Sequence, residues 1–201
     1  IIGISATFLA TALGTVAALG LSRRNMPFKG TIMAILISPM VVPLIITSAG
    51  MFFFYSKIGL THTYLGLILA HTALGTPFVV ITVTATLTGF DTNLIRASHS
   101  LGANTMRTFF KVIMPLILPG VISGALFAFI TSFDEVVVVM FIGSVEQITI
   151  PKQMWAGLRQ ETSPVILCMA TCLVFLSIAL LTTVELLRRR SERLRGIKLQ
   201  N

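Results

Sequence analysis

The chain carries little charge for its length. Only 11% of its 201 residues are Asp, Glu, Lys or Arg, while 55% are hydrophobic. A typical soluble domain carries about 25% charged residues, so this composition argues against a soluble protein. Five stretches have no charged residue, and each is long enough to cross a bilayer as a helix, which takes about 20 residues; they are residues 1–22, 30–56, 58–90, 112–133 and 162–184.

These uncharged stretches predict an all-α membrane protein, because a chain in hydrocarbon must satisfy its own backbone hydrogen bonds. No repeat or low-complexity linker interrupts the sequence, so we expect a single transmembrane domain over residues 1–201. The chain does not begin with Met and its first span starts at Ile1, so we expect an upstream helix and six spans in the full protein. The five spans expected here cover residues of about 1–21, 30–54 (kinked by Pro39 and Pro43), 63–88, 116–142 and 164–187.

The basic residues are distributed unevenly between the connecting segments. Twelve of the 15 Lys and Arg residues follow the first, third and fifth spans, and only Lys57, Lys152 and Arg159 lie in the other connections. Membrane proteins keep Lys and Arg on the cytoplasmic side. The sequence therefore predicts a cytoplasmic C-terminus, with Ile1 on the outside, and the net charge of +8 needs no nucleic-acid partner.

Residue types that carry catalysis or bind metals are scarce and scattered. His62, His71 and His99 fall in an outer loop, a span and a cytoplasmic segment, so they form no catalytic cluster. Cys168 and Cys172 lie within the last span without further metal-ligand partners. The chain also lacks the Gly-x-x-x-x-Gly-Lys-Ser/Thr loop that binds nucleotide phosphates. We therefore expect no catalytic residues, no metal site and no cofactor on this chain.

A polar, basic elbow at about residues 89–114 separates the third and fourth spans. Asp91 and Asn104 are placed to cap two short helices, and Gly102 between them suits a helix end that needs positive φ. The elbow is therefore expected to be two amphipathic helices hinged at a glycine, with Arg96, Arg107 and Lys111 on the polar face. The apolar positions recur at helical spacing; they are Leu94, Ala97, Ser98 and Leu101 in the first helix, and Met106, Phe109, Phe110 and Ile113 in the second.

The elbow contains a spaced motif. Arg96-Ala97-Ser98 is followed after three residues by Gly102, after nine more by Val112, and then by Met114-Pro115. This resembles the coupling motif of the permease subunits of ATP-binding-cassette (ABC) importers: Glu-Ala-Ala, three residues, Gly, nine residues, Ile, one residue, Leu-Pro. The Ala, Gly and Pro positions match, and Arg96 in place of Glu is the main departure.

The resemblance extends over roughly residues 1–195. Ser132–Val137, Thr149-Ile150-Pro151 and the basic end Glu185–Arg190 are similar to the second permease of spermidine/putrescine-type importers. The implied fold is the type I importer permease of the bacterial inner membrane. The implied partners are a pair of ATPase subunits that bind ATP and Mg, a second permease that is either identical or different, and a periplasmic solute-binding protein. The ATPase-coupling residues implied by the motif are Arg96, Ala97, Ser98, Leu101, Gly102 and Ala103.

The resemblance leaves the solute open. A small cation such as putrescine or spermidine is expected first, while iron, an amino acid or another small solute would suit the same family. A secondary carrier is a further alternative, although such carriers usually show internal repeats with broken helices, which this sequence does not show. A membrane enzyme would need the cluster of reactive groups that is missing here.

Two adjacent acids, Asp134 and Glu135, lie within the fourth expected span. A charge at the bilayer centre costs about 2.5–3.5 kcal/mol on insertion scales, which makes it a candidate functional group. We expect the pair to attract a cationic substrate into the pathway, and at most one of them to face it, because neighbouring helical residues point about 100° apart. The alternative is that both lie at the outer surface or tie spans together.

Overall fold

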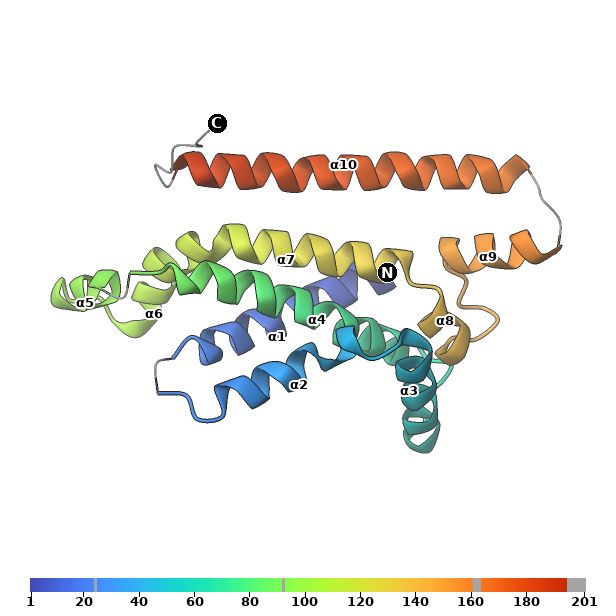
Figure 1. Cartoon of the computed structure of the whole chain (residues 1–201), viewed down its shortest axis with the longest axis horizontal. Coiled ribbons are helices and arrows are strands. Elements are labelled where there is room, and N and C mark those ends of the chain that lie inside the picture. Colours follow the sequence, from blue (N-terminus) through green and yellow to red (C-terminus); the bar gives the residue numbers. More distant parts are fainter. Residues whose placement is uncertain (24, 92, 161–163, 195–201) are drawn as a thin grey trace.

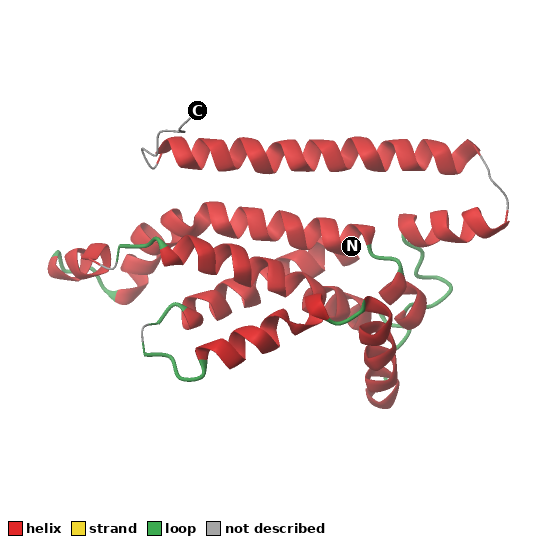
Figure 2. Cartoon of the chain, in the orientation of Figure 1, coloured by secondary structure: helices red, strands yellow, loops and turns green. Residues whose placement is uncertain are grey.

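The protein is a bundle of helices in the computed structural model, which describes residues 1–23, 25–91, 93–160 and 164–194. All regular secondary structure in this part of the chain is helical (Figure 2). In chain order the elements are α1 (Ile2–Leu21), α2 (Lys29–Val41), α3 (Leu44–Ile58), α4 (Tyr64–Thr88), α5 (Asn93–Ser100), α6 (Thr105–Thr108), the π-helix η1 (Phe109–Ile113), α7 (Met114–Asp134), α8 (Val137–Ile142), α9 (Ile150–Gln160) and α10 (Pro164–Leu194).

Small residues hold α1, α4 and α7 together. A Cβ atom on Gly14 of α1 would lie 2.6 Å from Val79 Cβ of α4, and one on Gly124 of α7 would lie 2.8 Å from Val79 Cα. Close backbone approach of this kind replaces the hydrophobic effect as the source of helix association in lipid, because the lipid tails are as apolar as the side chains. The buried cluster at this junction consists of Ala10, Ala18, Val79, Val83, Ile117, Val121 and Ala128.

The second expected span is broken rather than kinked. α2 and α3 meet at an angle of 102°, so the prediction of one kinked helix over residues 30–54 is wrong. Pro43 lacks an amide proton and forces the preceding residue out of the helical region, and Val42 is accordingly extended, with φ −71° and ψ 135°. Pro39, by contrast, stays within α2. The described residues therefore contain four long apolar helices, or five spans if the bent pair counts as one.

The fourth span begins earlier and ends earlier than the sequence suggests. Residues Thr105–Asp134 form one continuous helical stretch, so Pro115 and Pro119 neither stop the second elbow helix nor separate it from the span. The π-turn η1 accommodates this, because Met114 N–H donates to Phe109 O five residues back just before Pro115, which has no donor. The helix then stops at Asp134, and α8 starts at Val137, so the expected continuation to 142 is wrong.

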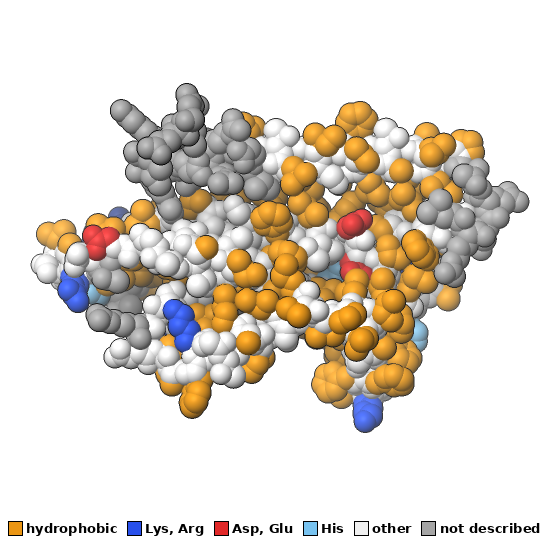
Figure 3. Space-filling view, in the orientation of Figure 1, with side chains coloured by type: hydrophobic (Ala, Val, Ile, Leu, Met, Phe, Trp, Pro, Cys, Tyr) orange, Lys and Arg blue, Asp and Glu red, His pale blue; other side chains and the backbone are white. Residues whose placement is uncertain are grey.

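The connecting segments divide between two ends of the bundle. The elbow (α5 and α6), the α1–α2 connection and the end of α10 lie at one end, while α3, α8 and α9 lie at the other (Figure 1). In the space-filling view the Lys and Arg side chains gather mainly at the elbow end, and the body between is largely hydrophobic (Figure 3). The segments that the sequence places on one side of the membrane therefore share one end of the molecule.

α10 lies alongside α7 (Figure 1). None of its residues in Ile166–Thr183 is buried inside this chain. Its apolar side chains, such as Leu167 and Phe175, are exposed. A helix that is apolar and unburied along its whole span is suited to lipid or to another membrane subunit.

We predict that filling the α4–α7 contact destabilises the bundle. Gly124→Val would place methyl groups against the α4 backbone at Val79, and overpacking typically costs about 1–3 kcal/mol. The thermal unfolding midpoint of the detergent-purified protein should therefore fall by several degrees. Gly20→Val is the matched control, because a Cβ atom at Gly20 meets nothing within 4 Å; an equal fall in both variants would contradict the packing argument.

Candidate functional site

The first elbow helix starts at an acidic cap, as the sequence predicts. The Asp91 Oδ1 atom accepts a hydrogen bond from Asn93 N–H at 2.9 Å, which satisfies one of the amides left free at a helix start. Thr92, expected as the first helical residue, lies outside the described residues. The helix is short, so this cap and the turn at its other end fix its direction.

The turn after α5 is closed by three hydrogen bonds. Gly102 has φ +79°, which confirms the predicted left-handed cap. Ala103 N–H donates to Ser98 O at 3.0 Å and Gly102 N–H donates to His99 O at 2.9 Å, the pair of bonds that defines a Schellman helix end. The third bond joins the His99 imidazole Nδ1 and Ala103 O, which lie 3.0 Å apart. The corner, residues 101–104, is therefore closed by hydrogen bonds in this structure, and it is called here the bracket.

Asn104 caps the next helix, which the sequence also predicts. Its Oδ1 atom accepts from Arg107 N–H at 2.8 Å. Since Thr105 begins the continuous helix that ends at Asp134, this cap marks the start of the fourth span itself. The bracket thus joins α5 to a span through residues 101–104 alone.

The predicted coupling residues do not share one face. Arg96, Ala97 and Gly102 are exposed, and Leu101 is 89% exposed. Ala103 is half-buried. Ser98, predicted on the apolar face with Leu101, instead turns inward and is only 9% exposed.

Thr108 is the residue that the sequence reading missed. It is 2% exposed, and its hydroxyl lies 2.9 Å from that of Ser98. Two hydroxyl-bearing residues ten apart across a glycine corner are the only sequence signal of this contact, and it is a weak one. Ser98 is turned inward, and the large apolar side chains that the elbow exposes, called here the elbow surface, are Leu94, Leu101, Met106 and Phe110.

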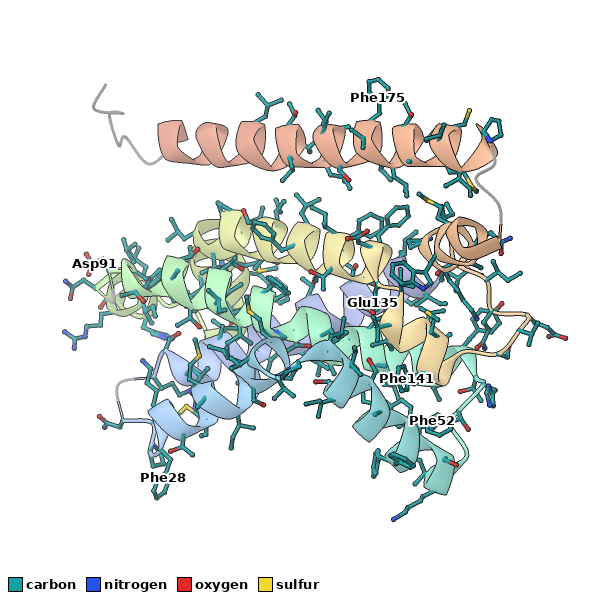
Figure 4. The ribbon with its side chains drawn as sticks, turned by 45° about the vertical axis from the view of Figure 1, so that its right-hand side comes forward. Phe28, Phe52, Asp91, Glu135, Phe141 and Phe175 are labelled. Carbon is teal, nitrogen blue, oxygen red and sulfur yellow. The ribbon has the colours of Figure 1, made fainter. Side chains whose placement is uncertain are left out.

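At the opposite end, the two adjacent acids take different roles. Glu135 is buried, and its Oε1 atom accepts from Val138 N–H at 2.9 Å, so the carboxylate caps the start of α8. Asp134, the last residue of α7, is exposed. Figure 4 labels Glu135 at this interruption, with Phe141 farther along α8.

Both acids line a cavity of about 640 Å³ formed by residues of α3, α7, α8 and α9. Its other lining is mostly apolar and includes Leu44, Phe141 and Trp155. Glu135 is hydrogen-bonded to the start of α8, and Asp134 is the exposed carboxylate of this cavity.

His71 is joined to α7 rather than to either acid. Its Nδ1 atom lies 2.7 Å from Ser132 Oγ, and the imidazole is buried between α4 and α7. This bond ties two helices of the central bundle together. Within the described part of the chain, no group of three or more His, Cys, Asp or Glu residues is placed to hold a metal ion.

Comparison with known proteins places this geometry in a family. Residues 10–194 match the family model described as "Binding-protein-dependent transport system inner membrane component". The spermidine/putrescine transport system permease protein PotC of Haemophilus influenzae is 31% identical over 186 residues, covering 92% of this chain and 72% of that protein. PotC of Escherichia coli is 30% identical over 185 residues, covering 92% and 70%. The putrescine transport system permease protein PotI of Escherichia coli is 29% identical over 189 residues, covering 86% and 66%.

The fold has a counterpart among solved structures. A chain in the inward-facing methionine ABC transporter MetNI superposes with a TM-score of 0.61 at 23% identity, covering 98% of this chain and 93% of that one. A second crystal form of the same transporter gives a TM-score of 0.59 at 24% identity. At this identity the likeness establishes the helical fold.

The family match, the relatives and the fold agree with one another. ABC permease subunits bind no cofactor, since the ATP is bound by the ATPase subunit, and they work with ATPase and solute-binding partners. The chain therefore belongs to the binding-protein-dependent transport inner-membrane family: it is the multi-pass permease subunit of an ABC importer and not an enzyme.

Proposed function

We propose that this permease forms, together with a second permease subunit, the membrane pathway for a small cationic amine of the putrescine or spermidine class. The relatives named for spermidine/putrescine and putrescine transport support this substrate class. Residues 1–201 act as one transmembrane domain in this proposal. The methionine transporter shares only the fold, so it does not favour an amino acid.

The observation that carries the amine proposal is the exposed Asp134 at the apolar cavity. A carboxylate attracts an ammonium group more strongly as the surroundings become less polar. The aromatic faces of Phe141 and Trp155, which line the same cavity, can add cation–π attraction. The apolar lining suits the methylene chain between the amino groups. The cavity therefore offers a carboxylate for an ammonium group and apolar side chains for the chain that carries it.

The proposed ATPase contact is the elbow surface at the other end. Four apolar side chains are exposed there, on a corner fixed by backbone hydrogen bonds. An amphipathic helix of this kind can dock in a groove of a soluble partner. Arg96, exposed beside this surface in place of the acid of the family motif, would pair with an acidic group of the ATPase subunit.

The proposed orientation places the elbow, the α1–α2 connection and the C-terminus in the cytoplasm, with Ile1 and α9 on the periplasmic side. The twelve-to-three division of basic residues between the two sets of connections supports it. The solute-binding protein would then approach the end that carries α3, α8 and α9.

Cysteine labelling tests this orientation. In a variant without Cys168 and Cys172, a cysteine at Asn104 should resist an impermeant thiol reagent in spheroplasts, because the membrane shields the cytoplasmic side. A cysteine at Gln160 should react. Labelling of position 104 before permeabilisation would reverse the proposed orientation.

For the pathway, Asp134→Asn is the informative change, because it removes the charge and keeps the shape. A hydrogen bond to a charged group contributes about 1.5–3 kcal/mol, so uptake of putrescine at low concentration should fall about tenfold or more, while complex assembly and basal ATPase activity stay normal. Glu135→Gln is the matched control, since its amide oxygen can still accept from Val138 N–H and the residue should affect uptake less. Normal amine uptake by the Asp134 variant would refute the amine proposal.

For the ATPase contact, Leu101→Asp places a charge at the most exposed side chain of the elbow surface without touching the bundle. We expect the ATPase subunit to be lost from the detergent-purified complex, because burying an unpaired carboxylate is costly. Ser100→Asp adds the same charge one residue away and should retain most of the ATPase. Equal retention by both variants would show that the elbow surface is not the contact.

A further inference from the structure

The Ser98 and Thr108 hydroxyls form a buried bond across the elbow corner. The Ser98 hydroxyl donates to Ile95 O at 2.7 Å, which uses its only proton. The Thr108 hydroxyl, 2.9 Å away, must therefore be the donor to Ser98 Oγ. Both residues are almost completely enclosed, so water does not compete for this bond.

This bond joins two elements that otherwise meet only through the chain and apolar contact. Ser98 lies in the last turn of α5, and Thr108 lies in the first turn of the helical stretch Thr105–Asp134. In the part of the chain that the structure describes, it is the only side-chain hydrogen bond between α5 and that stretch. It links the two helical segments on either side of the corner formed by Gly102 and Ala103.

The π-turn η1 follows Thr108 directly. Phe109–Ile113 carry the five-residue hydrogen-bond step, and π-turns are local departures from the regular α-helix that often occur at functional sites. The bond from α5 therefore reaches the fourth span at Thr108, just before the π-turn η1. Without a firm link at Thr108, a displacement of α5 would be absorbed by bending at the corner before it reached the π-turn.

We propose that the Ser98–Thr108 bond is a latch that makes α5 and the fourth span move as one body, so that motion of the ATPase subunit reaches the outer end of α7. Ser98 and Thr108 are positioning residues here, because both are buried and neither is part of the elbow surface. The proposal rests on the proposed contact between the elbow surface and the ATPase. It assigns a role to Thr108, and it gives the motif position Ser98 an internal role in place of a partner contact.

The test uses Thr108→Val, which removes the donor hydroxyl at nearly constant shape. Ser98 keeps its bond to Ile95 O, so no buried donor is left unpaired. The complex of permeases and ATPase subunits would be reconstituted in nanodiscs, and hydrogen–deuterium exchange would be compared without nucleotide and after trapping with ATP and vanadate. The readouts are peptides covering residues 93–101, in the elbow, and 128–142, at the outer end. Neither readout depends on the identity of the solute.

In the unmodified complex we expect nucleotide trapping to change exchange in both peptides. In Thr108→Val the elbow response should remain, while the response at 128–142 should fall by at least half. Thr108→Ser restores the hydroxyl and should restore the outer response. Thr88→Val is the matched control, because the Thr88 hydroxyl only bonds back to Thr84 O within α4, and it should behave as the unmodified complex.

A full outer response in Thr108→Val, or an equal loss in Thr108→Ser, would overturn the latch. If Thr88→Val also lost the exchange response at residues 128–142, the loss would not be specific to the Ser98–Thr108 bond, and the latch would again be wrong. Failure of the underlying contact is recognised separately, because Leu101→Asp would then retain the ATPase subunit. If Leu101→Asp releases the ATPase while Thr108→Val transmits normally, the elbow contact stands and the latch alone is refuted.

Discussion

The backbone groups that are freed wherever a helix is interrupted constrain this structure more than any other factor. In hydrocarbon, water cannot satisfy those groups, so each interruption needs a partner supplied by the chain. The α7–α8 break has the Glu135 carboxylate as that partner, and the elbow corner has the Asn104 side chain and the Schellman bonds of Gly102 and Ala103. Two interruptions thus have such a partner within a few residues, at the α7–α8 break and at the elbow, and they lie at the two ends of the molecule where function is proposed. The α2–α3 break at Pro43 has no side-chain cap.

Between these ends, the backbones of α1, α4 and α7 approach one another closely. Glycine and alanine bring α1, α4 and α7 into backbone contact, and the His71–Ser132 bond adds a polar tie between α4 and α7. A tightly packed group of helices transmits displacement instead of absorbing it. The elbow bracket at one end and the cavity with Asp134 at the other are therefore connected by closely packed helices.

The two adjacent acids differ in their structural surroundings, and only one of them is free of a helix-capping role. Their spacing on a helix predicted that at most one of them would face the pathway, but the helix stops between them. Glu135 turns back to cap α8, and Asp134 is left at the cavity. A cationic solute would therefore meet one available carboxylate with aromatic and aliphatic surroundings. In the proposed function this environment suits one ammonium group of an amine together with its apolar chain, whereas a compact multivalent ion would need several oxygen ligands.

The sequence by itself determined the features that depend on local chemistry: the uncharged stretches, the caps at Asp91 and Asn104, the positive φ of Gly102 and the spacing of the coupling motif. Only the tertiary structure decided the 102° bend at Pro43, the continuity of the helix through Pro115, the separate roles of Asp134 and Glu135, and the pairing of Ser98 with Thr108. The physical reason is that a cap or a turn is set by residues within a few positions of each other. Whether a proline breaks a helix, or which face of a short helix is buried, depends instead on the segments packed against it.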